Sequence, residues 1–160
     1  FTNADGRYAP SSWDYGHIVN LTGGKRFGKN WEVGLNWRLQ GGGPYTPFDV
    51  GTSSRVAVWD ALQQGVPDYG AINTLRLPSF NQLNMRVDKR WYYKGWNLNL
   101  YFDVENLLAS PLTGPPFLDV VRDADGRPVA DPADPTRYQT KLVENVGTTV
   151  LPSVGVMVEF

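Results

Sequence analysis

The chain has 160 residues with 15 basic and 16 acidic side chains, so its formal net charge is −1 at pH 7. This balance offers neither the basic surface that binds nucleic acid nor an acidic tail, and the absence of cysteine excludes disulfides, thiolate metal sites and cysteine nucleophiles. No apolar run approaches the roughly 18 residues of a membrane-spanning helix, whereas a membrane-spanning β-strand needs only about 9–11 residues of alternating polarity. The 17 glycines and 12 prolines argue against long helices.

Five segments alternate apolar and polar residues with a period of two, as strands do when their two faces meet different surroundings. They are residues 17–27, 31–40, 83–93, 96–107 and 151–160. The alternation is weakest in 17–27, has no exception in 31–40, and is interrupted on the apolar face of 83–93 only by Lys89. The sequence therefore predicts an all-β chain of about five antiparallel strands.

The apolar face carries aromatic residues close to the short connections, which is typical of the aromatic girdle at a membrane interface. The residues predicted to face lipid or to form this girdle are Phe27, Trp31, Trp37, Trp91, Tyr93, Trp96, Phe102 and Phe160. The residues predicted to face the lumen are Asn36, Arg38, Arg86, Asp88, Arg90, Asn99, Asp103 and Glu105. A soluble sandwich also alternates, but its strands usually have only about 5–6 residues. The pattern favours a transmembrane β-barrel.

The connections between the predicted strands are of two kinds. Gly28-Lys29-Asn30 and Lys94-Gly95 are short turns, whereas 41–82 and 109–150 are long. Short periplasmic turns and long extracellular loops characterise bacterial outer-membrane barrels, so we predict that 1–16, 41–82 and 109–150 are extracellular. Five strands are too few for a barrel, and an odd number. We therefore expect the rest of the barrel to lie upstream and to pair with both edge strands.

Several motifs appear in a characteristic order along the chain. Trp13-Asp14-Tyr15-Gly16-His17 precedes the first strand, and the segment Gly-Gly-Pro-Tyr-Thr-Pro at 42–47 follows the second. The third strand reads Gln-Leu-Asn-Met-Arg-Val-Asp-Lys-Arg-Trp at 82–91, the fourth closes with Phe-Asp-Val-Glu-Asn-Leu at 102–107, and the chain ends with Leu-Pro-Ser-Val-Gly-Val-Met-Val-Glu-Phe. Together these motifs resemble the last five strands of a TonB-dependent receptor, a 22-stranded barrel filled by an N-terminal plug. Asn84 departs from the family, which often has Asp there, and Asp88 keeps the second acid.

The resemblance implies a part of a receptor in the Gram-negative cell outer membrane that takes up a scarce nutrient, such as a siderophore or an oligosaccharide. It implies contacts with membrane lipid and lipopolysaccharide, the upstream barrel and its plug, TonB through a segment absent from this sequence, and the barrel assembly machinery through Phe160. It implies no enzymatic activity, cofactor, metal or nucleic acid. An outer-membrane enzyme or adhesin built on a barrel, and a passive porin, remain alternatives.

The predicted loops offer candidate contacts for a small-molecule ligand whose identity the sequence does not give. These are the aromatic residues Trp13, Tyr15, Tyr45, Trp59 and Tyr69. Asp123-Ala124-Asp125-Gly126 is similar to the start of a calcium loop but lacks the downstream Glu, so a hairpin turn with arms at 117–122 and 138–143 is favoured. The single histidine, His17, lies with Asp14 at a loop–strand junction, where a structural hydrogen bond is expected.

Overall fold

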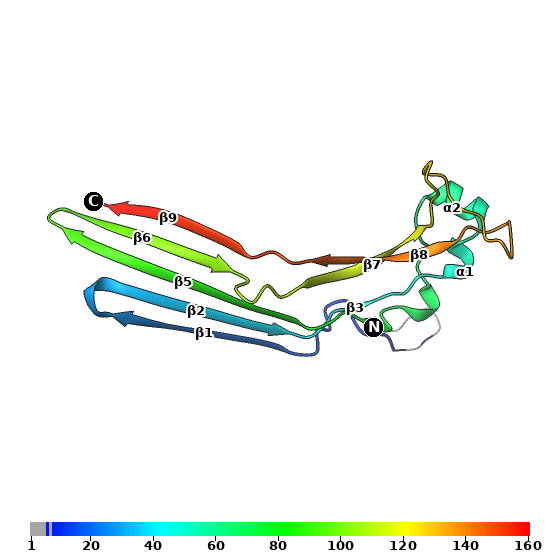
Figure 1. Ribbon diagram of the computed structural model, residues 1–160. Coiled ribbons are helices and arrows are strands. Elements are labelled where there is room, and N and C mark those ends of the chain that lie inside the picture. Colours follow the sequence, from blue (N-terminus) through cyan, green and yellow to red (C-terminus); the bar gives the residue numbers. More distant parts are fainter. Residues whose placement is uncertain (1–5, 7) are drawn as a thin grey trace. The chain divides into compact units, whose positions relative to one another are not determined.

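The computed structural model describes Gly6 and residues 8–160. This part of the chain is rich in antiparallel β-structure, with one five-stranded sheet, two two-stranded sheets and a few short helices (Figure 1). It divides into two compact units whose segments alternate along the sequence. The first, the sheet unit, contains residues 15–41, 79–112 and 147–160, and the second, the loop unit, contains 42–78, 113–146 and the N-terminal residues through Asp14. Within the described residues, no helix is long and apolar enough to cross a membrane.

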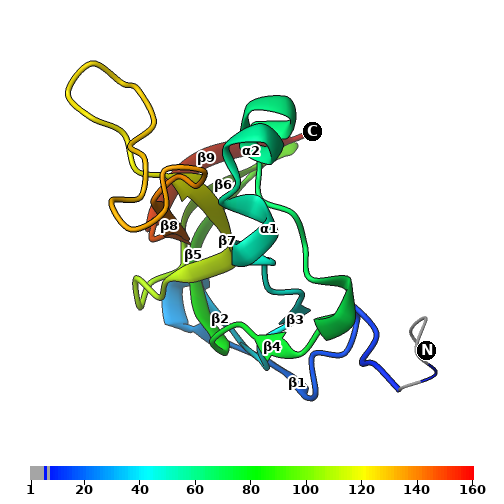
Figure 2. The ribbon, with the colours of Figure 1, turned by 90° about the vertical axis from the view of Figure 1, so that its right-hand side faces the viewer.

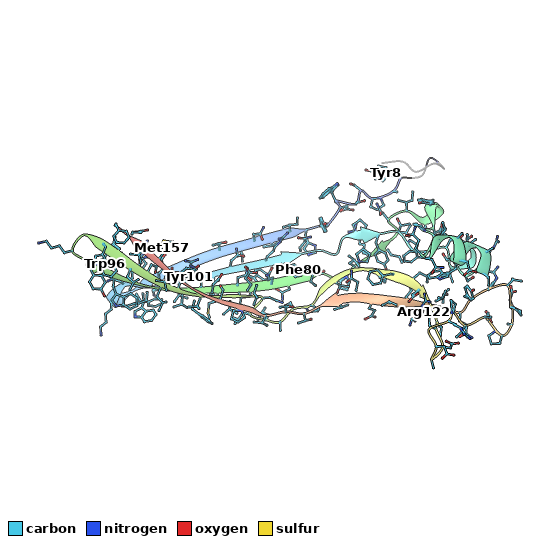
Figure 3. The ribbon with its side chains drawn as sticks, turned by 90° about the horizontal axis from the view of Figure 1, so that it is seen from above. Tyr8, Phe80, Trp96, Tyr101, Arg122 and Met157 are labelled. Carbon is cyan, nitrogen blue, oxygen red and sulfur yellow. The ribbon has the colours of Figure 1, made fainter. Side chains whose placement is uncertain are left out.

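The sheet unit consists of the five predicted strands. They are β1 (Ile18–Phe27), β2 (Trp31–Gln40), β5 (Phe80–Tyr93), β6 (Trp96–Glu105) and β9 (Leu151–Glu159). The strands lie in the order β1-β2-β5-β6-β9, every neighbouring pair is antiparallel, and their side chains project from both faces (Figure 3). The predicted antiparallel sheet is thus confirmed. Strands β1 and β9 are its two edges, so the described residues form an open sheet and no closed barrel.

Two short turns connect strands at one end of this sheet. The first contains the 3₁₀ turn η1 (Gly28–Asn30), in which Lys29 and Asn30 both have φ of 62°. The second is Lys94-Gly95, in which Gly95 has φ of 91°. A positive φ at glycine carries no steric penalty, so Gly95 suits this turn, whereas the first turn places the same demand on a lysine and an asparagine. Both predicted hairpin connections are therefore present.

The strand ends differ from the sequence-based boundaries at four places, of which the first is that β1 begins at Ile18 instead of residue 17. Strand β5 begins at Phe80 instead of residue 83, because its pairing with β2 continues through Asn81 and Gln82. The alternation had broken there, with Phe80 on the polar face and Asn81 on the apolar face. Strand β6 ends at Glu105 instead of residue 107, and β9 ends one residue before Phe160. Periodicity alone could not locate these ends, because backbone pairing continues beyond the patterned segment in β5 and stops short of its end in β6 and β9.

Asn106 ends β6 by adopting a left-handed backbone conformation, with φ of 55°. Its side-chain amide donates to the carbonyl oxygens of Ser110 (2.9 Å) and Thr149 (3.0 Å), and its oxygen accepts from the Ser110 N–H (3.0 Å). Its own backbone N–H donates to Asn84 Oδ1 at 3.0 Å. Asparagine tolerates this φ better than most residues, and here its side chain also satisfies the backbone groups that the strand end leaves unpaired.

The loop unit contains short helices that the sequence analysis did not predict. They are α1 (Val50–Ser53), α2 (Val56–Leu62) and the 3₁₀ turn η2 (Tyr69–Ala71), and the segment also contains a small sheet of β3 (Pro44–Tyr45) and β4 (Leu75–Arg76), seen in Figure 2. Asp49 caps α1, because its carboxylate accepts from the Thr52 N–H at 2.9 Å and the Thr52 hydroxyl at 2.6 Å. The buried Ser53 hydroxyl donates to the Asp49 carbonyl (2.6 Å) and accepts from the Val66 N–H (2.9 Å).

The other long segment of the loop unit forms the predicted hairpin, with arms that extend further than expected. Its strands are β7 (Leu112–Val120) and β8 (Thr140–Gly147), instead of 117–122 and 138–143. At the turn, Asp123 Oδ1 accepts from the N–H groups of Asp125 (3.0 Å) and Arg127 (2.8 Å), and Gly126 has φ of 79°. This is an Asx-type turn, so the carboxylate oxygen of Asp123 stabilises backbone geometry. The prediction of a hairpin turn is confirmed.

Hydrogen bonds join the two long segments of the loop unit to each other. Arg137 donates to the Gly51 carbonyl (2.5 Å) and the Ser54 hydroxyl (3.0 Å), and its Nε pairs with Asp134 at 3.1 Å. The backbone continues this contact, since the Tyr138 N–H donates to the Ser54 carbonyl (2.7 Å) and the Val56 N–H to the Thr136 carbonyl (2.9 Å). The tip of the hairpin is therefore attached to the start of α2.

The N-terminal segment is held against the same unit by side chains around η2 and β4. Asn73, with φ of 56°, donates to the Pro10 carbonyl at 2.8 Å. Arg76 binds both the carbonyl (2.8 Å) and the carboxylate (2.5 Å) of Asp14. In the sheet unit, the backbone of His17, the residue before β1, accepts from the Gly41 N–H at 2.9 Å. These contacts give Asp14 and His17 structural partners.

Protection of the loop unit against hydrogen exchange should fall in acid. Hydrogen bonds from Thr52 hold the pKa of Asp49 below its usual value, and those from Thr136 do the same for Asp134. A lowered folded-state pKa means that the stabilisation is present above the ordinary aspartate pKa of about 3.9 and is lost as the pH falls through the folded value. Hydrogen–deuterium exchange of 49–55 and 131–138, corrected for the intrinsic rate, should rise below about pH 4. The side chains in Asp49→Asn and Asp134→Asn can accept the same hydrogen bonds but do not titrate, so exchange in these variants should not rise in acid. The same rise in acid as in the wild type would contradict this account.

Candidate functional site

The register of the sheet determines which residues share a face, because directly opposed residues of antiparallel strands point to the same side. Arg86 is opposite Gly34 on one side and Asp103 on the other, whereas Leu98 is opposite Trp91. Arg86 and Trp91 are an odd number of residues apart, so Arg86 and Leu98 lie on opposite faces. By the same reasoning one face, here called the polar face, contains Asn36, Arg38, Arg86, Asp88, Arg90, Asn99, Asp103 and Glu105.

The central feature of the polar face is an ion pair within β5. Arg86 binds Asp88 with two bonds, from Nε to Oδ2 at 2.9 Å and from Nη2 to Oδ1 at 3.1 Å. Asn99, on the neighbouring β6, donates to the same Oδ1 at 3.0 Å. Asp88 is only 7% exposed although the sheet is open on this side. A two-bond arginine–carboxylate pair fixes the orientation of both groups, so Asp88 is held in place before anything else contacts this face.

A second charged group lies beside the first. Glu32 of β2 forms ion pairs with Arg26 of β1 (3.2 Å) and Arg90 of β5 (3.7 Å), and so connects three strands. These side chains are all at least one-third exposed, and in water each such pair would contribute only about 0–1 kcal/mol. Two arginines face one carboxylate in this group, whereas the charges of Arg86 and Asp88 compensate each other.

Tyr101 packs between β5 and β9 on the polar face. The Arg86 guanidinium lies 4.1 Å from the centre of the Tyr101 ring, in a cation–π contact. Opposite Tyr101 on β9 is Gly155, and a Cβ added there would meet Tyr101 Cζ at 2.2 Å. The ring therefore occupies the space above a glycine, as aromatic side chains do when a strand offers no Cβ. The Tyr101 ring thus contacts Arg86 on β5 and the backbone of Gly155 on β9.

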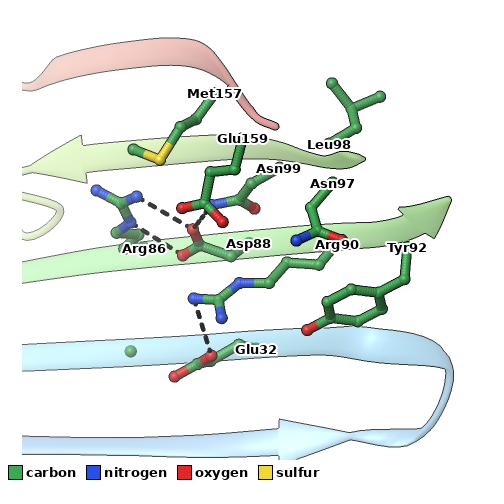
Figure 4. A pocket seen from close by; sticks show the side chains of 11 residues that line it. Glu32, Arg86, Asp88, Arg90, Tyr92, Asn97, Leu98, Asn99, Met157 and Glu159 are labelled. Atoms are coloured by element: carbon green, nitrogen blue, oxygen red, sulfur yellow. Dashed lines mark hydrogen bonds and ion pairs between the residues drawn. The ribbon is translucent and has the colours of Figure 1, made fainter. Parts of the chain in front are cut away.

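A hollow of about 440 Å³ lies on this face near the end with the short turns (Figure 4). Most of its lining side chains are polar, and they come from β2, β5, β6 and β9: Glu32, Arg86, Asp88, Arg90, Tyr92, Asn97, Asn99, Met157 and Glu159. Asn99 Oδ1 is buried and has no hydrogen-bond partner among the described residues. A buried acceptor without a donor is costly.

The structure brings together only part of the predicted polar set. Arg86, Asp88, Arg90 and Asn99 line the hollow. Asn36 instead donates to the Thr22 hydroxyl (2.7 Å), and Arg38 to the Gln40 side chain (2.5 Å). Four further residues of the polar face belong to the predicted alternation but were not among the predicted lumen-facing residues: Glu32, Asn97, Tyr101 and Glu159. Their places on the polar side of the pattern were the signal for them, once neighbouring strands are aligned.

The opposite face of the sheet is apolar and is not covered by another element within the described part of the sheet unit. Phe27, Trp31, Trp37, Trp91, Tyr93, Trp96 and Phe102 lie on it, and Phe160, fully exposed, follows the last strand. Tyr93 and Trp96 stack at 4.4 Å across the second short turn. The indole N–H of Trp37 donates to Asn81 Oδ1 at 2.7 Å. Asn81, a polar residue on this face near the start of β5, thus provides the acceptor for the indole N–H of Trp37.

The predicted ligand contacts in the loops have different environments. Trp13 is 83% exposed and Tyr69 is 71% exposed, while Tyr15 and Tyr45 are half-buried. Trp59 is a correction, because it is only 2% exposed and belongs to the core of the loop unit with Leu118 and Val120. It lies within α2, in the segment 41–82 that the sequence predicted to be an extracellular loop. Its ring is not available for stacking on a ligand.

Comparisons with known proteins provide no relative for this chain. No family model, no curated protein and no solved structure matches it.

Proposed function

We propose that this chain is a transmembrane β-sheet segment of a nutrient-uptake receptor of the Gram-negative outer membrane, similar to a TonB-dependent receptor. The observation that carries the proposal is a five-stranded sheet with one largely apolar face and one polar face that carries charges of both signs. In a soluble protein such an apolar face would be covered by a second layer. Hydrocarbon would cover it equally well in a membrane, and the strands of 9–14 residues have a length suited to that role.

The connections at the two ends of the strands indicate how the sheet would be oriented in the membrane. Aromatic rings of the apolar face gather beside the short turns, as expected at a membrane interface. The connections at the other end of the sheet run from 41 to 79 and from 106 to 150. We infer that the turns face the periplasm and the loop unit faces the exterior. Backbone groups along the edges of β1 and β9 would then pair with other strands of a complete barrel, since an unpaired edge in lipid costs several kcal/mol per group.

Transport through such a barrel is the activity we propose, and its substrate is a scarce nutrient such as a siderophore or an oligosaccharide. The resemblance of the strand motifs to TonB-dependent receptors supports this choice over a passive porin, an adhesin or a barrel enzyme. Deleting the gene should abolish growth on the limiting nutrient, and uptake should also be lost when TonB is removed. Uptake that persists without TonB would indicate a passive pore.

Spin labels placed one at a time along β6 should show a period of two. These 160 residues contain no cysteine, so a single cysteine introduced in β6 has no competing label site within this segment. Labels at 98, 100 and 102 should be more accessible to oxygen, which concentrates in lipid, and labels at 99, 101 and 103 to a water-soluble nickel complex. The measurement is power-saturation electron paramagnetic resonance of the full-length protein in native membranes. Water accessibility at every position would contradict a membrane location.

Removing Phe160 should lower the amount of folded barrel without changing uptake per folded molecule. Phe160 is fully exposed beside β9, which suits the proposed recognition by the assembly machinery. The measurement is the quantity of heat-modifiable protein in the outer-membrane fraction. Phe160→Tyr keeps an aromatic ring and should retain assembly. Unchanged levels after the deletion would contradict the proposed role.

A further inference from the structure

Two lysines lie on the apolar face of the sheet, and no other charged residue of its strands does so. Lys25 is opposite Val33, and Lys89 is opposite Trp31 and Leu100. Both are near the end of the sheet that carries the short turns. An ammonium group on a face that otherwise meets hydrocarbon is costly at mid-depth and much less costly near the interface. Their position therefore requires polar surroundings at this level.

The ammonium groups lie against aromatic rings and point toward the turn. Lys89 Nζ is 5.2 Å from the centre of the Trp31 ring and 5.4 Å from that of Trp91, and it also donates to the carbonyl oxygen of Lys29 in the first turn. Lys25 Nζ is 5.5 Å from the centre of the Phe27 ring. Lysine side chains at a membrane interface reach in this way from the apolar region to the head-group level.

No carboxylate neutralises either lysine. Among the described residues, neither Lys25 nor Lys89 takes part in an ion pair. The acids nearest in sequence are Glu32 and Asp88. Each is adjacent along its strand to a residue of the apolar face (Trp31 and Lys89, respectively), so the pleat directs both acids to the polar face. The apolar face thus carries two positive charges that no carboxylate of this sheet pairs with, so an anion bound there would come from outside the sheet.

We propose that Lys25 and Lys89, with the rings of Phe27, Trp31 and Trp91, bind the phosphate group of an anionic phospholipid. Lys89 has donors left beyond the one that binds the Lys29 carbonyl, because an ammonium group carries three. The rings provide a surface for the glycerol and the upper acyl chains. This inference rests on the proposed membrane location and adds a preferred lipid at the turn side of the sheet.

The test is quenching of tryptophan fluorescence by brominated lipids in the full-length protein reconstituted into phosphatidylcholine vesicles. Quenching by brominated phosphatidylglycerol relative to brominated phosphatidylcholine gives the relative association constant. Replacing Lys25 and Lys89 by glutamine should lower the preference for phosphatidylglycerol about fivefold for each lysine. Lys25→Arg with Lys89→Arg keeps the charges and should keep the preference. Lys141→Gln, in β8 of the loop unit, changes the same charge elsewhere and should have no effect.

The outcomes separate this inference from the proposed function. If the wild-type protein fails to insert into vesicles, as judged by flotation and heat modifiability, the membrane location itself is wrong. If it inserts but shows no preference for phosphatidylglycerol, or if the glutamine variant keeps that preference, only the lipid site is wrong. Lys94→Gln, in the second turn, removes a charge at the same level. An effect of Lys94→Gln equal to that of the paired variant would show a general surface attraction and overturn the site.

Discussion

Replacing Val154 by arginine should lower the free energy of unfolding in a bilayer by about 2–4 kcal/mol. Val154 is 71% exposed on the apolar face of β9, opposite Phe102. Phe102 is in turn opposite Val87 of β5, so the row through Val154 is apolar on three adjacent strands. A guanidinium group placed there has no acid to pair with and would be desolvated by the acyl chains.

The adjacent residue provides a matched control. Ser153 is opposite Asp103, on the polar face, so Ser153→Arg adds the same side chain one position away, where a carboxylate is available. Its cost should stay below about 1 kcal/mol. Urea-induced unfolding of the full-length protein in vesicles measures both variants. Equal destabilisation by the two arginines would mean that the faces do not differ in solvent, and the membrane proposal would have to be abandoned.

Replacing Gly155 by alanine should destabilise the pairing of β6 with β9 by about 1–3 kcal/mol. The new Cβ would lie 2.2 Å from Tyr101 Cζ, so the ring would have to leave its place above the glycine. Moving the ring would also remove its contact with the Arg86 guanidinium. A single methyl group would therefore disturb three strands at once.

A double-mutant cycle isolates this effect. In a Tyr101→Ala background the ring is absent, and Gly155→Ala should cost little. Gly34→Ala is the matched control on the same face, because no atom lies within 4 Å of the position its Cβ would take. Unfolding in vesicles again provides the measurement. The packing account fails if Gly155→Ala is tolerated in the wild type, or if its cost is the same with and without Tyr101.

The sequence predicted the sheet well because strands whose two faces meet different surroundings all follow one simple rule. Apolar and polar residues must alternate, and Arg86, Asp88 and Leu98 could be assigned to faces from this rule alone. The contacts between strands could not be assigned in the same way. That Tyr101 lies over Gly155, or that Glu32 meets both Arg26 and Arg90, depends on the register, which the alternation fixes only to within a shift of two residues.

The loop unit was harder to predict because its structure depends on contacts between distant segments. The helices α1 and α2 have only four and seven residues, too short to be stable by themselves. They are held by backbone bonds such as that from the Val56 N–H to the Thr136 carbonyl. Without these contacts Trp59 is one more aromatic residue in a polar segment, and its burial could not be read from the local sequence.

The attachment of the hairpin tip to α1 and α2 limits how this protein can be rebuilt by exchange of surface segments. Arg137 belongs to one long connection, and the Gly51 carbonyl and Ser54 hydroxyl that it binds belong to the other. A chimaera that takes residues 42–78 from another protein and keeps 113–146 would leave the guanidinium without acceptors. The two segments should therefore be transplanted as a pair, and sequence variants of one should be tolerated only with compensating changes in the other.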